Sequence, residues 1–499
     1  MTHTAPRLSD LLAGAAIEPL DALTADPAIR GVQLDSRRVG DGDLFFALKG
    51  EHADGERFVP QAIERGARAI VAASVRPAGL DEGVAWIRVE QPRSTAGPLS
   101  REFFGRPDER LALVGITGTN GKTTVSYMVQ AIADAAGRRA GRIGTTGFAF
   151  AGVEEPLERT TPEATDLFAL LDDMRSRGAD LVAMEVSSHA LSLGRVASAR
   201  FSVAAFLNLT RDHLDYYADE DAYFEAKASL FDALGPESFG VIPAGSPWGD
   251  RIAARTRARL TRFGRTADAD VRLTGEDCRS GGSTATLVIP AGRLKIEISM
   301  PGRFNLDNAA AAAACAIQLG IDADAIVAGL RGLSGVPGRV QRIDCGQPYD
   351  VWVDYAHTPD ALERMLRQAR ELTHGRLLVV FGCGGDRDRG KRVEMGHAVA
   401  GHADISFITS DNPRGEDPDR IIDQVRAGVE QVSGAEFRSH ADRRESIAAA
   451  VAMAEPGDLV VIAGKGHETT QDIAGERYRF DDRDVATAAI QARSGDGHA

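Results

Sequence analysis

A glycine-rich turn between an apolar run and an amphipathic segment constrains the fold of this chain more than any other feature. Residues 111–116 are mostly apolar and predict a buried parallel strand, and residues 123–136 have the spacing of a helix that ends at Gly137. Between them stands the sequence Gly118-Thr119-Asn120-Gly121-Lys122-Thr123-Thr124. Backbone N–H groups at a helix start, together with a lysine, bind nucleotide phosphates, and a threonine hydroxyl at this place can reach Mg²⁺. The turn therefore predicts a phosphate loop, in a variant form because Ile116 replaces the first consensus glycine.

Apolar segments farther along the chain predict two α/β sheets. Strands expected at residues 181–186 and 203–209 alternate with helical segments, as in a doubly wound parallel sheet. A Gly/Pro-rich stretch at 334–339 predicts a linker, and a second α/β pattern follows it, with strands at 377–381, 405–409 and 459–463. We therefore expect an α/β protein with three domains at residues 1–107, 108–336 and 337–499, of which the central one is a phosphate-loop ATPase with a parallel or mixed sheet.

The composition excludes several classes of protein. The chain has 499 residues, of which 43% are hydrophobic, and a net charge of -14, which would repel a nucleic-acid backbone. The longest apolar run, residues 309–317, is too short to span a bilayer, and Asp10 and Glu18 stand where a secretory signal needs a basic start and an apolar core. The four cysteines form no C-x-x-C pair. We expect a cytoplasmic monomer that binds no nucleic acid and does not insert into a membrane.

Glu185, His213 and Lys227 are candidates for metal binding or catalysis. The first two are expected near the carboxyl ends of strands, and the third on a neighbouring helix. Glu185 is expected at a strand end beside the phosphate loop, either as a Mg²⁺ ligand or as a structural carboxylate paired with an arginine. His213 follows the next strand and is a candidate ligand for a second divalent ion, or a structural histidine. Lys227 shares a helical face with apolar residues such as Tyr223 and Phe231, so it either extends to water or is a desolvated, neutral amine open to modification.

Four further motifs, together with the phosphate loop, carry a resemblance to a known family. They are Glu185-Val186-Ser187-Ser188-His189, Asp212-His213-Leu214-Asp215, Asp354-Tyr355-Ala356-His357-Thr358-Pro359-Asp360 and Asp411-Asn412-Pro413-Arg414. In this order, and over nearly the whole chain, they resemble the Mur ligases, and among them the MurE type. The resemblance implies an N-terminal domain that binds a UDP-sugar peptide, a central ATPase domain and a Rossmann-like C-terminal domain that binds the amino acid.

The resemblance also implies an activity. Such enzymes are ADP-forming ligases of peptidoglycan synthesis, which add meso-2,6-diaminopimelate to UDP-N-acetylmuramoyl-L-alanyl-D-glutamate. ATP converts the glutamate carboxylate into an acyl phosphate, and the incoming amine then attacks this intermediate. Two Mg²⁺ ions and a carbamylated lysine, here Lys227, belong to the implied machinery.

Roles for individual residues follow from the same resemblance. Lys122, Lys227 and His213 are implied in catalysis, and metal ligands are implied at Thr123, Glu185, His213 and Lys227. ATP contacts are implied at Gly118, Thr119, Asn120, Gly121, Lys122, Thr123, Thr124, Asp354 and His357, and contacts with the UDP-sugar peptide at Ser36, Thr160, Thr161, Ser187 and Arg195. The diaminopimelate positions are Arg387, Asp411, Asn412, Pro413, Arg414, Gly464 and Glu468. Thr160 and Glu163 also have the spacing of a helix capping box.

The choice of amino acid depends on Arg414. Pro413 would stiffen a loop at the ligand-binding edge of the sheet and present Arg414, whose planar guanidinium pairs with a carboxylate through two hydrogen bonds. Diaminopimelate differs from lysine by one carboxylate at its far end. Arg414 therefore favours diaminopimelate, with an L-lysine-adding ligase of the same type as the alternative.

Two other classes share parts of the pattern. A folylpolyglutamate synthetase would share the phosphate loop and the acyl phosphate, but it would need neither a UDP-sugar domain nor the loop from Asp411 to Arg414. A nucleotide switch of the GTPase type is disfavoured because no asparagine is followed by lysine, as the guanine-binding motif requires. A hydride-transferring dehydrogenase is disfavoured as well, because neither Gly382-Cys383-Gly384 nor Gly464-Lys465-Gly466 completes a dinucleotide-binding motif.

Overall fold

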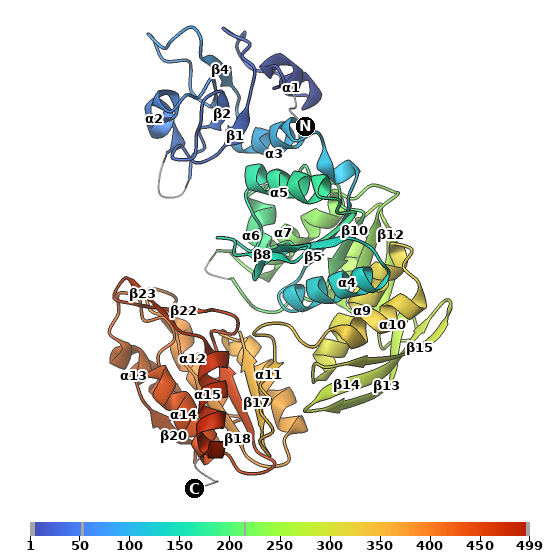
Figure 1. Cartoon of the computed structure of the whole chain (residues 1–499), viewed down its shortest axis with the longest axis vertical. Helices are drawn as coiled ribbons and strands as arrows, with labels where there is room; N and C mark the ends of the chain where they lie inside the picture. The colour runs from blue at the N-terminus through green and yellow to red at the C-terminus, as the bar shows by residue number, and fades with distance from the viewer. Residues whose placement is uncertain (1–4, 51–53, 214–215, 496–499) are drawn as a thin grey trace.

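Three successive parts of the chain each form their own main sheet in the computed structural model, which describes residues 5–50, 54–213 and 216–495. Figure 1 shows these parts following one another from the blue N-terminal end, through green and yellow, to the red C-terminal end. Leu214 and Asp215 of the predicted Asp212–Asp215 motif lie outside the described residues. None of the helices within the described ranges is both long and apolar enough to cross a membrane. The predicted α/β class is confirmed, and the domain boundaries stay predictions.

The N-terminal part is a parallel sheet of four strands in the order β1-β2-β3-β4. Its elements are α1 (Leu8–Gly14), β1 (Gly31–Gln33), β2 (Asp43–Phe46), η1 (Gly55–Phe58), α2 (Val59–Glu64), β3 (Ala69–Ala72), β4 (Ala85–Arg88), α3 (Pro92–Phe103) and η2 (Pro107–Glu109). Successive side chains on a strand point to opposite faces. Phe46 therefore packs with residues of α1 and α3, while Phe45 packs with residues of α2 on the other face.

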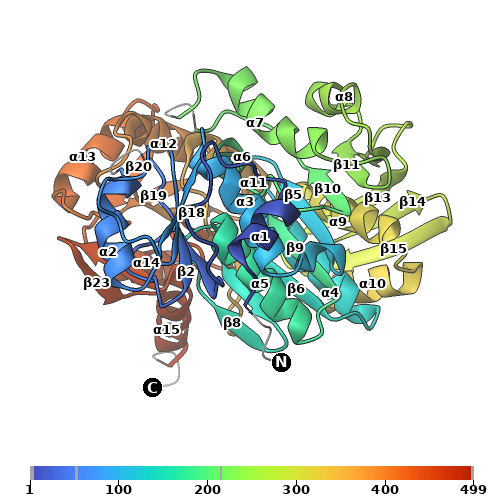
Figure 2. The same cartoon turned by 90° about the horizontal axis from the view of Figure 1, so that it is seen from above.

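The central part is a mixed sheet of eleven strands in the order β15-β14-β13-β12-β11-β10-β5-β9-β6-β7-β8. Its elements are β5 (Ala112–Thr117), α4 (Lys122–Ala135), β6 (Ala140–Gly144), β7 (Gly147–Phe150), β8 (Val153–Glu155), α5 (Ala164–Ser176), β9 (Leu181–Glu185), α6 (Ser188–Ser192), β10 (Val203–Phe206), α7 (Glu220–Asp232), β11 (Phe239–Pro243), α8 (Pro247–Ala253), β12 (Arg259–Gly264), β13 (Val271–Arg279), β14 (Gly282–Ile289), β15 (Gly292–Ile298), α9 (Arg303–Gln318) and α10 (Ala323–Gly332). The strands from β13 to β6 are parallel, and antiparallel strands extend both edges. Figure 2 shows β14 and β15 at one side of the molecule, opposite α13 of the C-terminal part.

Both faces of the central sheet are covered by helices, which is why its middle strands are apolar throughout. One hydrophobic cluster joins the strands to α4, α9 and α10, and the other joins them to α5 and α7. The phosphate loop follows β5, an inner strand of the parallel region, and β9 and β10 lie on its two sides. Loops after these three strands therefore meet at one edge of the sheet.

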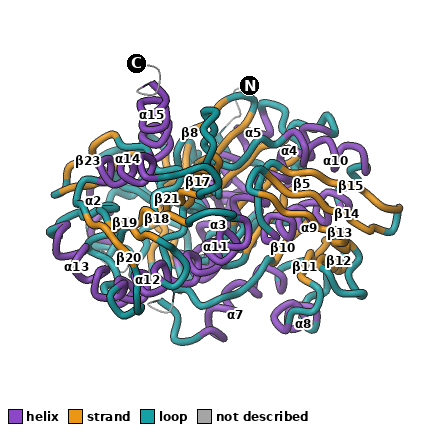
Figure 3. Tube along the Cα trace, turned by 90° about the horizontal axis from the view of Figure 1, so that it is seen from below, coloured by secondary structure: helices purple, strands orange, loops and turns teal. Residues whose placement is uncertain are grey.

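The C-terminal part is a second sheet, in the order β16-β17-β21-β18-β19-β20, and all its strands except β16 are parallel. Its elements are β16 (Gln341–Arg342), β17 (Asp350–Asp354), α11 (Pro359–Leu372), β18 (Leu377–Phe381), α12 (Gly390–Ala400), β19 (Ile405–Ile408), α13 (Pro418–Val429), β20 (Glu436–Ser439), α14 (Arg443–Met453), β21 (Leu459–Ala463), β22 (Thr470–Ile473), β23 (Glu476–Arg479) and α15 (Asp482–Gly495). Figure 3 shows α14 and α15 on one side of the strands and α11, α12 and α13 on the other, in agreement with two separate hydrophobic clusters. The loops at the carboxyl ends of β17, β18, β19 and β21 carry the predicted site residues.

Candidate active site

The phosphate loop depends on two glycines with left-handed backbone angles. Gly118 and Gly121 have φ values of +148° and +91°, and a β-carbon on Gly121 would lie 2.4 Å from Asn308 Oδ1. A side chain at Gly121 would therefore collide with a neighbouring helix as well as strain the backbone. Lys122 Nζ donates hydrogen bonds to the carbonyl oxygens of Gly118 (2.8 Å) and Thr119 (2.9 Å). Burial lowers the pKa of Lys122. The loop thus encloses a cation beside the start of α4.

Glu185 ends β9 directly beside this loop, and its side chain is buried. Its carboxylate accepts hydrogen bonds from Thr123 Oγ1 (3.0 Å), Thr145 N (2.8 Å) and Thr145 Oγ1 (3.0 Å). These donors are hydroxyl and backbone groups, so the alternative of a carboxylate paired with an arginine is wrong. Arg339 Nη2 donates to Thr123 Oγ1 (3.1 Å), which brings a cation from the segment before β17 to the same hydroxyl.

Lys227 lies on α7 with 1% of its surface exposed, so the alternative in which it extends to water is wrong. Its Nζ donates to the Gly118 carbonyl (3.1 Å) and lies 4.3 Å from the centre of the Tyr223 ring. Burial, with a smaller effect from the charge on Lys122, lowers the pKa of Lys227 well below its usual value. Of the two alternatives that the sequence left open for Lys227, the structure thus agrees with the desolvated amine.

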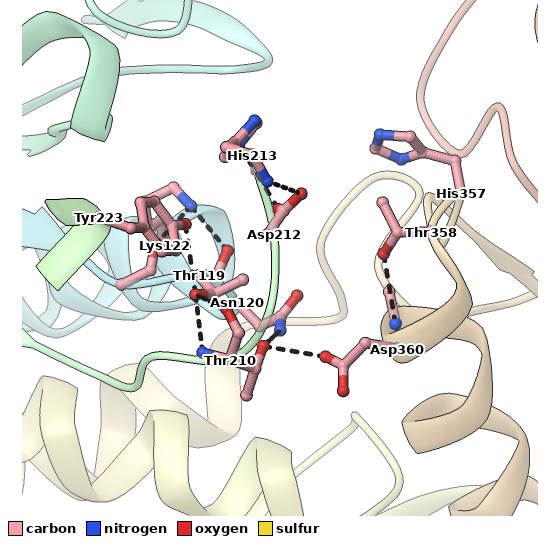
Figure 4. Close-up of polar contacts among 12 residues, drawn as sticks. Thr119, Asn120, Lys122, Thr210, Asp212, His213, Tyr223, His357, Thr358 and Asp360 are labelled. Carbon is pink, nitrogen blue, oxygen red and sulfur yellow. Dashed lines mark hydrogen bonds and ion pairs between the residues drawn. The ribbon is translucent and has the colours of Figure 1, made fainter. Parts of the chain in front are cut away.

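His213 lies above the loop with a left-handed φ of +54°. Its Nε2 is 3.5 Å from Asp212 Oδ2, and its ring centre is 4.9 Å from that of His189. Burial lowers the pKa of His213, which favours the neutral ring that a metal ligand requires. Figure 4 shows His213 and Asp212 on the side of the phosphate loop and His357 on the facing side.

A cavity of about 820 Å³ joins most of the predicted residues of the central part to residues of the C-terminal part. It is lined by Thr119, Asn120, Gly121, Lys122, Thr123, Thr124, Thr160, Thr161, Glu185, Ser187, Arg195, His213, Asp354 and His357, together with Arg339 and other residues. At one side Thr210 Oγ1 donates to Asp360 Oδ2 (2.9 Å), a hydrogen bond between the two parts that Figure 4 shows. Most of the residues predicted to bind ATP and the peptide, with the exceptions of Gly118 and Ser36, thus line one cavity.

The residues predicted to bind the UDP-sugar peptide form a hydrogen-bonded group around Glu185. Thr160 Oγ1 lies 3.1 Å from Thr145 Oγ1, and Thr161 Oγ1 donates to the Glu185 carbonyl (2.9 Å) and accepts from Ser187 N (3.0 Å). Arg195 Nη1 donates to the carbonyl of Thr161 (3.2 Å).

The predicted capping box at Thr160 and Glu163 is wrong. Helix α5 begins at Ala164, and Glu163, its N-cap residue, makes no side-chain hydrogen bond to the helix. The carboxylate of Glu163 lies 2.9 Å from Arg195 Nε and 3.3 Å from Arg93 Nη1 instead. Two guanidinium groups attract a carboxylate more strongly than neutral backbone N–H groups do.

Asp354 and His357 line the cavity in different ways. Both carboxylate oxygens of Asp354 accept backbone hydrogen bonds, from Val340 N (2.7 Å) and Ala356 N (2.8 Å). Asp354 thereby supports the turn next to Arg339, and its predicted contact with ATP remains untested. His357 is exposed, with Nδ1 2.8 Å from the Tyr355 carbonyl.

Ser36 lies in the N-terminal part and does not line the cavity. Its Oγ donates to Gln61 Oε1 (2.7 Å). The N-terminal and central parts contact each other through the ion pairs Arg38–Asp166 (2.8 Å) and Arg93–Glu163 (3.3 Å).

The residues predicted to bind diaminopimelate gather at the carboxyl ends of β18, β19 and β21. We call this group, together with the neighbouring Lys465, the C-terminal polar cluster; its predicted members are Arg387, Asp411, Asn412, Pro413, Arg414, Gly464 and Glu468. Asn412 Nδ2 donates to Glu468 Oε2 (2.9 Å), and Lys465 Nζ donates to both Asn412 Oδ1 (3.0 Å) and Glu468 Oε2 (3.0 Å). A β-carbon on Gly464 would lie 2.6 Å from Asp411 Oδ2. These loops therefore form one cluster of opposite charges.

Arg387 and Arg414 flank Gly384 at the edge of this cluster. A β-carbon on Gly384 would lie 3.0 Å from Arg414 Nη1 and 3.8 Å from Arg387 Cγ. Arg414 Nη1 also donates to the Gly385 carbonyl (2.8 Å). The guanidinium of Arg414 and the aliphatic stem of Arg387 therefore lie at the same backbone position, and the Arg414 cation favours an anionic group there.

Several residues of the site had not been identified from the sequence. Arg339 stood in a Gly/Pro-rich stretch that read as a linker, and Thr145 carried no motif. Asn308 lies in an alanine-rich helix, and Lys465 stood between two glycines. Only the Gly-Lys-Gly pattern around Lys465, directly after a predicted strand, was a local signal that could have revealed one of them.

No group of three or more His, Cys, Asp or Glu side chains in the described ranges has the arrangement of a metal site. A divalent ion at Thr123 and Glu185 would therefore need oxygen ligands from a bound nucleotide or from a modified side chain. Mg²⁺ commonly binds in this way, through one or two carboxylates and substrate phosphates.

Comparisons with known proteins agree with this geometry. Family models match in three segments: "Mur ligase family, catalytic domain" at residues 28–103, "Mur ligase middle domain" at 116–316 and "Mur ligase, glutamate ligase domain" at 338–466. Two relatives are both named UDP-N-acetylmuramoyl-L-alanyl-D-glutamate–2,6-diaminopimelate ligase. The one from Geobacter metallireducens is 42% identical, covering 94% of this chain and 95% of the relative, and the one from Bacillus velezensis is 42% identical, covering 97% and 99%. A solved structure of an enzyme with the same name has a TM-score of 0.68 and 35% identity, and covers 94% of this chain and 96% of that chain.

Proposed function

This chain belongs to the Mur ligase family, and from that premise we propose that it is the ATP-dependent ligase that adds meso-2,6-diaminopimelate to UDP-N-acetylmuramoyl-L-alanyl-D-glutamate. The named relatives carry out this reaction over chains of nearly the same length. The observation that supports it within this chain is the common cavity, where the phosphate loop, Glu185 and the Thr160–Thr161 pair lie together. A carboxylate bound near Thr160 would be within reach of the terminal phosphate of a nucleotide on the loop.

The chemistry then divides into two steps. In the first, an oxygen of the glutamate carboxylate attacks the terminal phosphorus of ATP, and the bond to ADP breaks. In the second, the amine of the incoming residue attacks the carbonyl carbon of the acyl phosphate, and inorganic phosphate leaves. Lys122 and the N–H groups at the start of α4 bind the phosphates, and Arg339 is placed to offset charge that develops on them.

Thr123 and Glu185 would bind a first Mg²⁺, and His213 and a carbamylated Lys227 would bind a second. The ions would draw charge from the phosphates during transfer. Two observations support a modified Lys227: burial lowers the pKa of its amine well below the usual value, and no carboxylate shares a hydrogen bond with it among the described contacts. A carbamate would turn this position into an anion beside the cation Lys122.

The C-terminal polar cluster would bind the amine substrate. Arg414 would pair with its distal carboxylate, Arg387 would contact the amino acid, and Glu468 and the backbone at Gly464 would hold its distal ammonium and carboxylate groups. Ser36 would contact the uridine diphosphate in the N-terminal part. We further propose that the enzyme acts as a cytoplasmic monomer.

Phosphate release tests this function. The purified protein would be given ATP, Mg²⁺ and UDP-N-acetylmuramoyl-L-alanyl-D-glutamate, with meso-diaminopimelate, L-lysine or no amine. We expect release only with diaminopimelate, and a product heavier by that residue less water. A preference for L-lysine would keep the ligase but refute the role of the two arginines, and no release with either amine from folded, ATP-binding protein would refute the proposal.

A further inference from the structure

Arg392 is a buried cation beneath the C-terminal polar cluster and does not belong to the predicted site. It lies on α12, and its side chain is 0% exposed. Its Nη1 donates to Glu416 Oε2 (3.1 Å) and Gln424 Oε1 (2.8 Å), and its Nη2 donates to Glu416 Oε1 (2.9 Å) and the Gly384 carbonyl (3.2 Å). One guanidinium therefore contacts both the loop after β18 and the loop after β19.

Glu416 completes the connection between these two loops. Besides Arg392, its Oε1 accepts a hydrogen bond from Asp386 N (2.6 Å), next to Arg387. Glu416 itself lies two residues after Arg414. The pair Arg392–Glu416 thus connects Asp386, which precedes Arg387, with the segment that follows Arg414.

Further hydrogen bonds between the same loops surround this pair. Gly385 N donates to the Asn412 carbonyl (2.9 Å), and Gly415 N donates to Asp386 Oδ2 (2.9 Å). Asp386 and Arg414 both have left-handed φ values, +52° and +51°. Non-glycine residues adopt this conformation only where surrounding contacts impose it. The loops are therefore held in a strained arrangement that the buried pair supports.

The Arg392 side chain is fully buried and that of Glu416 is 15% exposed, and such a partly buried ion pair is weak evidence for stability because desolvation offsets most of the attraction. Its geometry is better suited to positioning, since a planar guanidinium that forms four hydrogen bonds fixes its partners in direction as well as in distance. We propose that Arg392 and Glu416 are positioning residues that set the spacing of Arg387 and Arg414, and thereby the affinity for an amine substrate with a distal carboxylate. This inference rests on the proposed function.

Glu416 stays ionised under assay conditions. Its hydrogen bonds with Arg392 lower the pKa of Glu416 to about 2, well below neutral pH. The Glu416→Gln change therefore removes a charge that the wild-type side chain carries in the assay.

The test is the Glu416→Gln variant, which keeps the shape of the side chain and removes its charge. We expect the KM for diaminopimelate to rise by roughly tenfold or more, as displacement of a binding group by a fraction of an ångström does. The KM for ATP and the kcat at saturating substrates should stay near the wild-type values. The double variant Arg392→Gln Glu416→Gln should cost no more than the larger single change, because the two residues act as one unit.

A matched control is available at the opposite end of the same sheet. Asp458, also buried, accepts hydrogen bonds from Arg376 Nε (3.1 Å) and Nη2 (2.7 Å), far from the carboxyl ends of the strands. Asp458→Asn should lower the melting temperature without a selective effect on the KM for diaminopimelate.

Each outcome decides the matter. A selective rise with Glu416→Gln supports the proposal, whereas equal changes in both KM values, or none, overturn it. If that variant fails to fold, the exposed Gln424 provides the test. Gln424→Ala removes one of the four hydrogen bonds of the Arg392 guanidinium and should raise the KM for diaminopimelate by about twofold to threefold, and no change would refute the positioning role. Wild-type protein that releases phosphate with no amine would refute the proposed function, and not this inference alone.

Discussion

Removal of the Arg414 guanidinium tests how this enzyme selects its amino acid. The main chain at this position is held independently of the side chain, since Arg414 N donates to the Asp472 carbonyl (3.0 Å) and its carbonyl accepts from Ala474 N (2.7 Å). Arginine already has a β-carbon at φ +51°, so alanine adds no backbone strain. Arg414→Ala therefore changes little besides the cation and its hydrogen bond to Gly385.

The size of the effect follows from the chemistry of the pair. A hydrogen bond to a charged group contributes about 1.5–3 kcal/mol. Because 1.4 kcal/mol corresponds to about a factor of ten in affinity, the KM for diaminopimelate should rise by roughly tenfold to a hundredfold. The KM for ATP should change by less than about twofold, since Arg414 does not line the cavity of the phosphate loop.

Phosphate release, with each substrate varied at saturating concentrations of the others, measures both constants. Arg414→Lys is the matched control, because it keeps the charge and loses the planar fork; it should recover only part of the affinity. L-Lysine lacks the distal carboxylate, so any residual turnover of L-lysine should be the same in wild type and variant. Equal rises in the KM for ATP and for diaminopimelate would refute the carboxylate-binding role.

Three further variants test the phosphate loop and its surroundings. Lys227→Met should abolish phosphate release, without rescue by bicarbonate, yet keep or raise the melting temperature. The pKa of Lys227 is lower in the folded than in the unfolded state, so the wild-type amine destabilises the folded protein at any pH below its unfolded pKa. This destabilisation decreases as the pH rises towards the unfolded pKa. Unchanged turnover would remove Lys227 from the mechanism. Glu185→Gln should lower kcat by roughly a hundredfold and raise the Mg²⁺ concentration needed for half-maximal rate, and a normal Mg²⁺ titration would contradict its role as a ligand. Gly121→Ala should abolish binding of a fluorescent ATP analogue, because the new β-carbon would lie 2.4 Å from Asn308 Oδ1. Gly137→Ala is the control: there is open space around Gly137, so this variant should bind the analogue normally. Equal binding by both variants would refute the steric argument.

Local patterns in the sequence determined much of the fold and part of the site. The strand–turn–helix around Gly118 and Lys122 was predictable because glycine, lysine and apolar periodicity specify backbone angles and burial within a few residues. The same spacing placed Lys227 on an apolar helical face but left open whether its amine is buried or extends to water. Phosphate binding by the loop also followed from the local pattern, whereas the carbamylation of Lys227 came from the resemblance to a family.

Contacts between distant segments were decided only by the tertiary structure. Arg339 reaches Thr123 across 216 residues, and Thr210 reaches Asp360 across 150 residues, with no pattern in the sequence that links the two partners of either pair. The capping box at Thr160 and Glu163 failed because two arginines from other segments attract the carboxylate of Glu163. Local residue spacing encodes conformation, but a long-range contact depends on how complete sheets and helices pack. This packing brings Arg392 into contact with two loops, after β18 and after β19, that no pattern in the sequence connects.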